Sequence, residues 1–213
     1  MSRQETVTGQ AGATGQAPVL VLACGALARE IGALLEQQGL RHVTLRCLPA
    51  QWHNRPERIA PAVARELARA RRVFAHVFVA YAECGTQGAL DAVLARAGVA
   101  RLPGPHCYAF FSGAEAFAAQ GTADMRSFFL TDFLARHFES LVFRPLGLDR
   151  HPELRDAYFG HYERVVHLAQ TEDAALTARA QRAAARLGLG YERRLTGYGD
   201  LAAALRRLPE SAA

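Results

Sequence analysis

Lysine is missing from this sequence, and all 25 basic residues among its 213 are arginine. The absence excludes chemistry that needs an ammonium group, such as Schiff-base catalysis or the phosphate-binding lysine of a Walker loop. The arginines are scattered next to acidic residues, as in Glu57 with Arg58 and Arg65 with Glu66. This mixed pattern is typical of solvated helix faces, so we expect no nucleic-acid partner despite the formal net charge of +5.

Long apolar runs are missing as well. No stretch approaches the roughly 20 residues that a membrane-spanning helix needs, so we expect no membrane partner. Residues 1–16 lack the basic start and apolar middle of a signal peptide, and their Gly, Thr and Gln content predicts a disordered tail. Without export, we expect a cytoplasmic protein whose four cysteines are free thiols or metal ligands, because disulfides are rare in that compartment.

Common catalytic and metal-binding motifs are absent too. The sequence has no Cys-x-x-Cys, no Gly-x-Ser-x-Gly and no His-Glu-x-x-His, and no Gly-x-Gly-x-x-Gly follows the first predicted strand. Asp91, Asp132 and Asp149 form no evident carboxylate pair. Whether the chain is an enzyme is therefore left open.

Segments of strand and helix character alternate along most of the sequence. Half of the residues are apolar, which suits one substantial core in a chain of this length. Short apolar or alternating runs predict strands, and apolar residues at helical spacing predict helices. The predicted strands are residues 18–23, 42–48, 73–81, 99–102, 164–169 and 191–195. The predicted helices are residues 26–38, 57–71, 87–97, 108–119, most of 127–143, 152–162, 173–187 and 200–208.

This alternation predicts an α/β fold with a mostly parallel sheet covered by helices on both faces, a Rossmann-like arrangement of three layers. No internal repeat and no linker interrupts it. We therefore expect a single domain over residues 17–209, preceded by the tail of residues 1–16 and followed by a short tail at 210–213.

Three cysteines, Cys24, Cys84 and Cys107, each come just after a predicted strand and near a following helix start. Ligands of open α/β sheets bind outside the carboxyl ends of the strands, and helix starts favour a thiolate over a thiol. The placement predicts a shared thiol site. The residues alone leave a second interpretation open, in which these cysteines are small buried side chains of the core. Cys47 lies inside a predicted strand, and we interpret it as core.

Loops beside these cysteines supply further candidates. Glycine after a cysteine permits a tight turn or the close approach of a ligand. The candidate ligand-contacting positions are Gly25, Asn54, Gly85 and Thr86.

Two histidines lie in predicted loops that we expect at the same edge of the sheet. His106 adjoins Cys107 after Pro103-Gly104-Pro105, and His53 lies in the loop after the second predicted strand. Each is a candidate fourth metal ligand or general base. The alternative is that both are ordinary surface histidines. No functional interpretation attaches to the other histidines, which include His137 and His167.

Several segments together resemble a known family. They are Cys24-Gly25, Leu48-Pro49-Ala50 with His53-Asn54-Arg55-Pro56, Ala80-Tyr81 with Cys84-Gly85, Arg101-Leu102-Pro103 with His106-Cys107, and residues 128–133, FFLTDF. Together they resemble the bacterial and archaeal family called domain of unknown function 1638, over about residues 18–208.

The resemblance implies a cytoplasmic protein whose gene lies near those of corrinoid proteins and methyltransferases of one-carbon metabolism, and hence an accessory role in methyl transfer. It places Cys24, Cys84 and Cys107 on the family's cysteine positions and leaves Cys47 off them. It also implies that relatives have Asp where this chain has His106, which counts against an obligatory ligand at that position.

Our first hypothesis is therefore a metal-binding protein of corrinoid-linked methyl metabolism. Cys24, Cys84 and Cys107 would hold zinc or an iron–sulfur cluster with one open position. Zinc would activate a thiol or water, whereas a cluster would pass an electron, for example to a corrinoid. The alternatives are a non-catalytic scaffold for a methyltransferase–corrinoid complex, and a cysteine-dependent enzyme without metal that uses His53 or His106 as its base.

Overall fold

The computed structural model describes residues 18–119 and 124–209, which form two compact units. Within these residues, the first unit combines residues 18–110 with residues 200–209, and the second combines residues 111–119 with residues 124–199. The predicted tails at 1–16 and 210–213 lie outside the described residues. One domain over residues 17–209 stays a prediction, because compactness alone does not show whether a unit folds independently.

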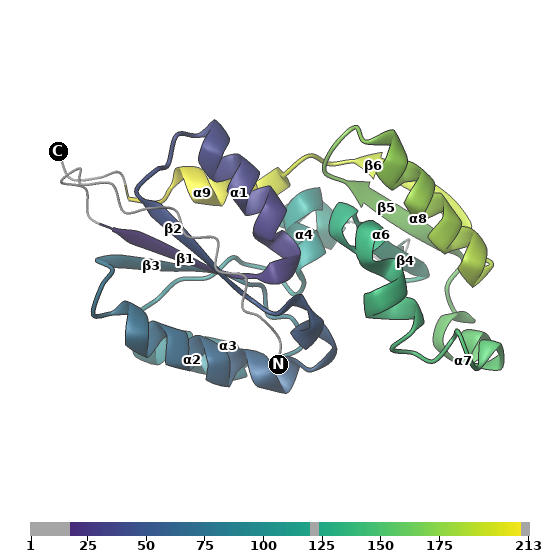
Figure 1. Ribbon diagram of the computed structural model, residues 1–213, viewed down its shortest axis with the longest axis horizontal. Helices are drawn as coiled ribbons and strands as arrows, with labels where there is room; N and C mark the ends of the chain where they lie inside the picture. The colour runs from purple at the N-terminus through teal and green to yellow at the C-terminus, as the bar shows by residue number, and fades with distance from the viewer. Residues whose placement is uncertain (1–17, 120–123, 210–213) are drawn as a thin grey trace. The chain divides into compact units, whose positions relative to one another are not determined.

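A three-stranded parallel sheet in the order β2-β1-β3 forms the centre of the first unit (Figure 1). Its strands are β1 (Val19–Cys24), β2 (Val43–Leu48) and β3 (His76–Ala80). Strand β1 lies between its two partners, and all six of its residues are buried. A strand that is covered on both faces and both edges needs apolar side chains throughout, which explains the unbroken run VLVLAC.

Helices cover both faces of this first sheet. Figure 1 shows α1 (Ala28–Gln37) and α9 (Gly199–Arg206) on one face, with α2 (Ile59–Ala70) and α3 (Ala89–Ala97) on the other. The short helices of this unit are η1 (Gly25–Leu27), η2 (Ala50–Asn54), η3 (Pro56–Arg58) and α4 (Cys107–Ser112).

The strand predicted at residues 99–102 is reduced to an isolated bridge between Arg101 and Val79. The Val79 amide donates to the Ala100 carbonyl, and the Leu102 amide donates to the Val79 carbonyl. The next residue is Pro103, which has no N–H to extend such a ladder. The prediction of a strand at this position is therefore wrong, although the backbone runs beside β3.

The second unit has its own three-stranded parallel sheet, in the order β4-β5-β6. Its strands are β4 (Ser127–Thr131), β5 (Arg164–Ala169) and β6 (Gly190–Leu195). Its helices are α5 (Ala114–Ala119), α6 (Asp132–Phe138), η5 (Glu139–Phe143), η6 (Pro152–Leu154), α7 (Arg155–Phe159) and α8 (Ala174–Leu187). The predicted α/β class, with parallel strands flanked by helices, is confirmed, and the described strands form two sheets instead of one.

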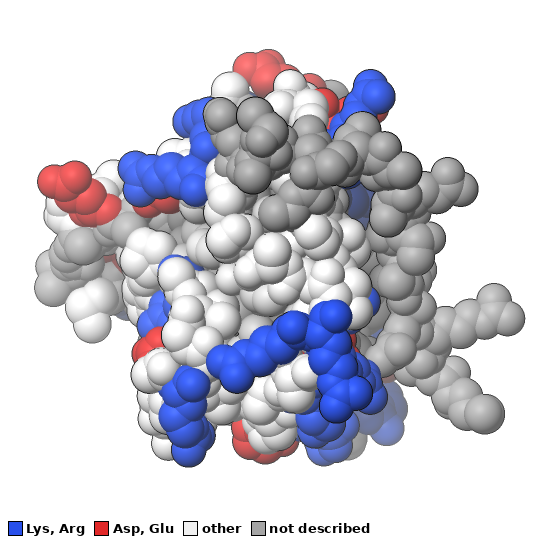
Figure 2. Space-filling view, turned by 90° about the vertical axis from the view of Figure 1, so that its left-hand side faces the viewer, with Lys and Arg blue, Asp and Glu red and all other residues white. Residues whose placement is uncertain are grey.

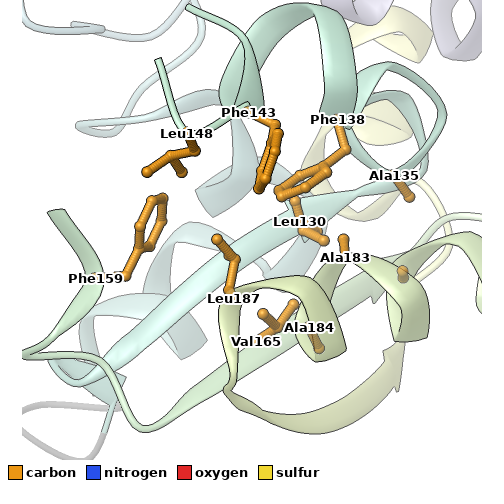
Figure 3. Packing of buried hydrophobic residues seen from close by; sticks show 11 residues of the cluster. Leu130, Ala135, Phe138, Phe143, Leu148, Phe159, Val165, Ala183, Ala184 and Leu187 are labelled. Atoms are coloured by element: carbon orange, nitrogen blue, oxygen red, sulfur yellow. The ribbon is translucent and has the colours of Figure 1, made fainter. Parts of the chain in front are cut away.

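A buried apolar cluster joins the strands of the second unit to α6 and α8 (Figure 3). Leu130 of β4 and Val165 of β5 supply the sheet side, and Phe138 and Phe143 place their ring centroids 6.0 Å apart above it. Small side chains of α8, such as Ala183, let this helix approach the sheet closely. The cluster explains why an alanine-rich helix is stable in this position.

Residues 127–131 begin the segment 127–143, most of which we predicted to be helix, and a strand was not predicted there. They form β4, whose residues pair with β5 from Ser127 opposite Arg164 to Thr131 opposite Leu168. The helix starts only at Asp132, where the Thr131 hydroxyl accepts a hydrogen bond from the Leu134 amide. The helix prediction therefore holds for residues 132–143, and the strand before this N-cap was missed.

We expect Gly25→Ala to destabilise the protein by about 1–3 kcal/mol, because the added carbon has no room. A Cβ on Gly25 would lie 2.9 Å from the Leu48 carbonyl oxygen and 3.2 Å from the Ala50 amide nitrogen, and both are backbone atoms. Gly32→Ala in α1 is the matched control, because nothing lies within 4 Å of its Cβ position. That control should stabilise by about 0.5–1 kcal/mol. Urea unfolding measures both, and an unchanged midpoint for Gly25→Ala would contradict the close contact.

Candidate functional site

The three candidate cysteines all lie at the carboxyl end of the first sheet. Cys24 is the last residue of β1, Cys84 lies in the loop after β3, and Cys107 is the first residue of α4. Their exposed fractions are 2%, 5% and 6%, so all three thiols are buried. The predicted placement after a strand therefore holds for Cys84, whereas Cys24 is still part of β1 and Cys107 follows the bridge that replaces the predicted strand.

Backbone hydrogen bonds tie the loops of Cys84 and Cys107 together. The Glu83 amide donates to the Gly104 carbonyl at 3.1 Å, and the Cys84 amide donates to the Pro105 carbonyl at 2.9 Å. The Sγ atoms of Cys84 and Cys107 lie 3.3 Å apart. Two sulfurs from separate segments are thus held in contact by the surrounding backbone.

The Cys84 loop has an unusual backbone that Glu83 stabilises. Cys84 and Gly85 have φ angles of +51° and +76°, and the left-handed region is unfavourable for a residue such as cysteine. The Glu83 carboxylate accepts hydrogen bonds from the Gly85 amide at 2.8 Å, the Thr86 hydroxyl at 2.8 Å and the Gly88 amide at 3.1 Å. These three bonds hold the loop in the conformation that directs the Cys84 thiol toward Cys107.

The two contacting thiols differ in acidity. The hydrogen bond from Cys107 lowers the pKa of Cys84, whereas the same bond, together with burial, raises the pKa of Cys107 well above its ordinary value. The pair therefore favours a Cys84 thiolate that accepts the S–H of Cys107. Burial raises the pKa of Cys24 to about 12, so Cys24 is a neutral thiol at ordinary pH unless it gains a positively charged partner.

Tyr81 lies beside these thiols. It follows β3 directly, and its exposed fraction is 1%. Burial raises the pKa of its hydroxyl well above the ordinary value, and the neighbouring Cys24, Cys107 and Cys84 raise it further. Among the described residues, the hydroxyl has no hydrogen-bond partner of ordinary geometry.

Both candidate histidines lie near this end of the sheet. His53 in η2 reaches the surface, yet the protein around its ring lowers its pKa, and the nearby His106 lowers it further. His106 is half-buried, and its ring stacks on Tyr108 with the centroids 5.0 Å apart. Burial lowers the pKa of His106, while Glu83 opposes that shift. Both shifts favour the neutral form of these two neighbouring rings.

The loop candidates gather at the same place. Gly25 follows Cys24 against the Leu48 carbonyl, and Pro56 lies 3.7 Å from the position that a Cβ on Gly85 would take. Thr86 is buried, and its hydroxyl donates a hydrogen bond to the Glu83 carboxylate. Asn54 is exposed at the end of η2. The loops after β1, β2 and β3 therefore meet around the cysteines, as the parallel sheet predicts.

Cys24 stands apart from the contact between Cys84 and Cys107. It lies close enough to influence the charge of both, but the 3.3 Å sulfur contact does not include it. Across residues 18–119 and 124–209, no group of three or more His, Cys, Asp or Glu side chains is arranged to hold a metal ion. Cys47 lies in β2 as predicted, but it is half-buried and not in the core.

Sequence reasoning gave no role in the site to three residues around the cysteines, which are Tyr81, Glu83 and Arg101. Tyr81 was interpreted as the end of a strand and as part of a family motif, although a hydroxyl at the end of an apolar run indicates a group that needs a hydrogen-bond partner. The Arg101 guanidinium binds the Asp91 carboxylate through two hydrogen bonds of 2.6 and 3.0 Å, and its positive charge lies near Cys84. No spacing rule in the sequence predicts that the Glu83 carboxylate accepts hydrogen bonds from the loop that follows it.

A second polar network, in the second unit, was also missed. Fully buried His167 of β5 places its Nε2 2.9 Å from Asp132 Oδ1 and its Nδ1 3.1 Å from the Tyr191 hydroxyl. The other Asp132 oxygen accepts from the amides of Gln170 and Thr171 and from the Thr171 hydroxyl. Burial alone would raise the pKa of Asp132, but the bonds from His167 and Thr171 outweigh it and hold that pKa below its usual range.

The surface charge relates to the prediction of no nucleic-acid partner, and the helices relate to the prediction of no membrane partner. Figure 2 shows basic side chains in separate groups around an uncharged centre, with acidic side chains among them. Within the described ranges, no helix has the length and apolar character needed to cross a membrane. The absence of a nucleic-acid partner and the cytoplasmic location both stay predictions.

The fold and the site define an α/β protein with helix-flanked parallel sheets and a buried cluster of thiols at the carboxyl end of one sheet. The chain belongs to the family described as "Protein of unknown function (DUF1638)", whose model matches residues 47–205. The predicted family membership is thus confirmed. The matched range includes Tyr81, Cys84 and Cys107 and begins after Cys24. No curated protein and no solved structure matches the chain.

Proposed function

We propose that this protein binds one thiophilic metal ion, with zinc as the first choice, through Cys84 and Cys107, and that Cys24 is the third ligand. The observation that carries the proposal is the 3.3 Å contact between two buried sulfurs. Thiolates are the preferred protein ligands of such ions, and the loops of Cys84 and Cys107 are already tied to each other.

The sulfur pair fits a tetrahedral ion with little movement. Two thiolates at about 2.3 Å from one zinc ion lie about 3.8 Å from each other, so the pair has to open by about 0.5 Å from its present 3.3 Å. Cys24 has to turn toward the pair, since the described residues place no third ligand in contact with it. A metal charge would favour the Cys24 thiolate, whose high pKa otherwise keeps it protonated.

An iron–sulfur cluster is the other species that three cysteines could hold. The sulfur contact favours a single ion, because a cluster places its own iron and sulfide atoms between the cysteine sulfurs. Three ligands leave a fourth position for an exchangeable group, and zinc with such a position activates a bound thiol or water. His53 and His106 are the candidate fourth ligands.

The biological setting of the site is a further part of the proposal. The family resemblance supports an accessory role in corrinoid-linked methyl transfer, with a corrinoid protein or a methyltransferase as partner. A metal-activated thiol suits methyl transfer, because a thiolate is a good methyl acceptor. The support for this part is association by resemblance.

Purification without oxygen, followed by elemental analysis and an assay of acid-labile sulfide, tests the proposal. We expect stoichiometric zinc without sulfide in the wild type and in Cys47→Ser, which is the matched control. Cys84→Ser and Cys107→Ser should each lose most of the metal, because serine is a poor zinc ligand.

Other outcomes separate the alternatives. Iron together with sulfide and a brown colour would indicate that the cysteines hold an iron–sulfur cluster and not zinc. Protein that is purified without metal and does not bind added zinc would rule out the metal site, provided that Cys84→Ser has the same metal content as the wild type. Co-purification of a corrinoid protein with metal-free chain would then favour the scaffold, and rapid alkylation of a single cysteine would favour the cysteine-dependent enzyme.

A further inference from the structure

The Tyr81 hydroxyl is the least explained polar group near the cysteines. It is buried, and no described residue forms a hydrogen bond of ordinary geometry with it. A buried polar group without a partner costs about 1–3 kcal/mol, and phenylalanine would fill the same space without that cost. The hydroxyl therefore favours a stronger acceptor than a neutral thiol, and the thiol beside it is that of Cys24.

Strand register places this hydroxyl beside Cys24. Ala23 of β1 is paired with Ala80 of β3, and the next residues along the two parallel strands are Cys24 and Tyr81. Side chains at matching positions of neighbouring parallel strands leave the sheet on the same side. The two side chains thus start as neighbours, and each affects the electrostatics of the other.

A neutral thiol is a weak hydrogen-bond acceptor, whereas a thiolate is a strong one. The Tyr81 hydroxyl already interacts with Cys24, and a Cys24 thiolate bound to a metal would accept its hydrogen bond more strongly than the neutral thiol does. The Cys84–Cys107 pair satisfies its own thiols, and the Ala26 backbone already interacts with Cys24, so the Tyr81 hydroxyl is a second hydrogen-bonding group for a charged Cys24.

We propose that Tyr81 is a positioning residue of the cysteine centre, whose hydroxyl donates a hydrogen bond to the Cys24 thiolate and so holds Cys24 as the third metal ligand. This inference rests on the proposed function. Groups that hydrogen-bond to metal ligands typically change metal affinity by about 10- to 100-fold. Tyr81 belongs to this class and does not touch the metal.

Tyr81→Phe tests the role. We expect zinc affinity, measured by competition with a chromophoric chelator, to fall about 10- to 100-fold. The free energy of unfolding of the metal-free protein should stay the same or rise, because the variant loses only an unpartnered hydroxyl. With cobalt in place of zinc, the thiolate-to-metal charge-transfer band should weaken, as we also expect for Cys24→Ser.

A double-mutant cycle separates this role from a merely structural one. In a Cys24→Ser background, Tyr81→Phe should have no further effect on affinity, because its partner is already gone. An equal loss of affinity in both backgrounds would overturn the inference. Wild-type affinity and an unchanged cobalt spectrum in Tyr81→Phe would overturn it as well.

A metal-free readout keeps this inference distinct from the proposed function. The hydroxyl favours the Cys24 thiolate, so Tyr81→Phe should slow the alkylation of Cys24 by iodoacetamide at a fixed alkaline pH, with Cys47 as an internal control in the same mass spectra. If the wild type binds no metal, the proposed function fails, and slower alkylation of Cys24 still supports its pairing with Tyr81. If the wild type binds metal and neither affinity nor alkylation changes, the Tyr81 inference alone fails.

Discussion

Asp132→Ala lowers the free energy of unfolding by about 3–5 kcal/mol, because it removes the acceptor at the centre of the buried network in the second unit. The variant leaves His167 Nε2, the Gln170 amide and both Thr171 donors without their partner. A loss of this size is a large share of the roughly 5–15 kcal/mol that stabilises a typical protein. Urea unfolding followed by circular dichroism measures it.

Two variants show whether the effect comes from the network. Asp132→Asn should cost only about 1–2 kcal/mol, since its oxygen can still accept from Thr171 while its amide donates to His167 Nε2 in the tautomer that carries the ring proton on Nδ1. Asp173→Ala removes an exposed helix N-cap, with bonds to the amides of Ala175 and Leu176, and should cost about 1 kcal/mol. Equal losses for all three variants would contradict a special role of the buried network.

The same network should also determine how the free energy of unfolding changes at acidic pH. The folded pKa of Asp132 is depressed, so its stabilisation is fully present above the unfolded value of about 3.9 and is lost as the pH falls through the folded pKa. In that acidic range Asp132→Asn should lose less stability than the wild type. A parallel loss in both proteins would contradict the assignment.

The fold could be predicted where burial and local pattern agree. The unbroken run of β1 indicates a fully buried parallel strand, and the structure contains that strand between two partners. The strand at residues 127–131 was missed because its apolar residues also fit the helical spacing of α6, and the N-cap of Thr131 is a weak local signal. The division into two sheets depends on long-range pairing, which no local pattern encodes.

The sequence predicts where the three cysteines lie, but it does not predict which of them are in contact. The rule for strand ends brought Cys24, Cys84 and Cys107 to one end of a sheet, and they do lie there. That Cys84 and Cys107 touch, while Cys24 stands apart, depends on the hydrogen bonds between two loops and on the left-handed backbone of Cys84. His167 and Asp132 were missed because residues 35 positions apart in sequence meet only through strand pairing.

Mild oxidation should abolish metal binding through a disulfide between Cys84 and Cys107. The Cys84 thiolate attacks an added small disulfide and releases one thiol. The Cys107 thiol then loses its proton, attacks the mixed disulfide and releases the second thiol, so the two protein thiols are oxidised and the reagent is reduced to two thiols. The 3.3 Å sulfur separation favours this pair over pairs that involve Cys24 or Cys47.

Peptide mapping of the oxidised protein should identify a bond between Cys84 and Cys107, with Cys24 and Cys47 still free, and added zinc should no longer bind until a dithiol reductant is supplied. Cys24→Ser is the matched control, because it removes the proposed third ligand and should still form the disulfide. Oxidised protein that retains its zinc, or a disulfide that links Cys24 to Cys84, would contradict the proposed ligand set. The metal and the disulfide compete for the same two sulfurs, so loss of one species should accompany formation of the other.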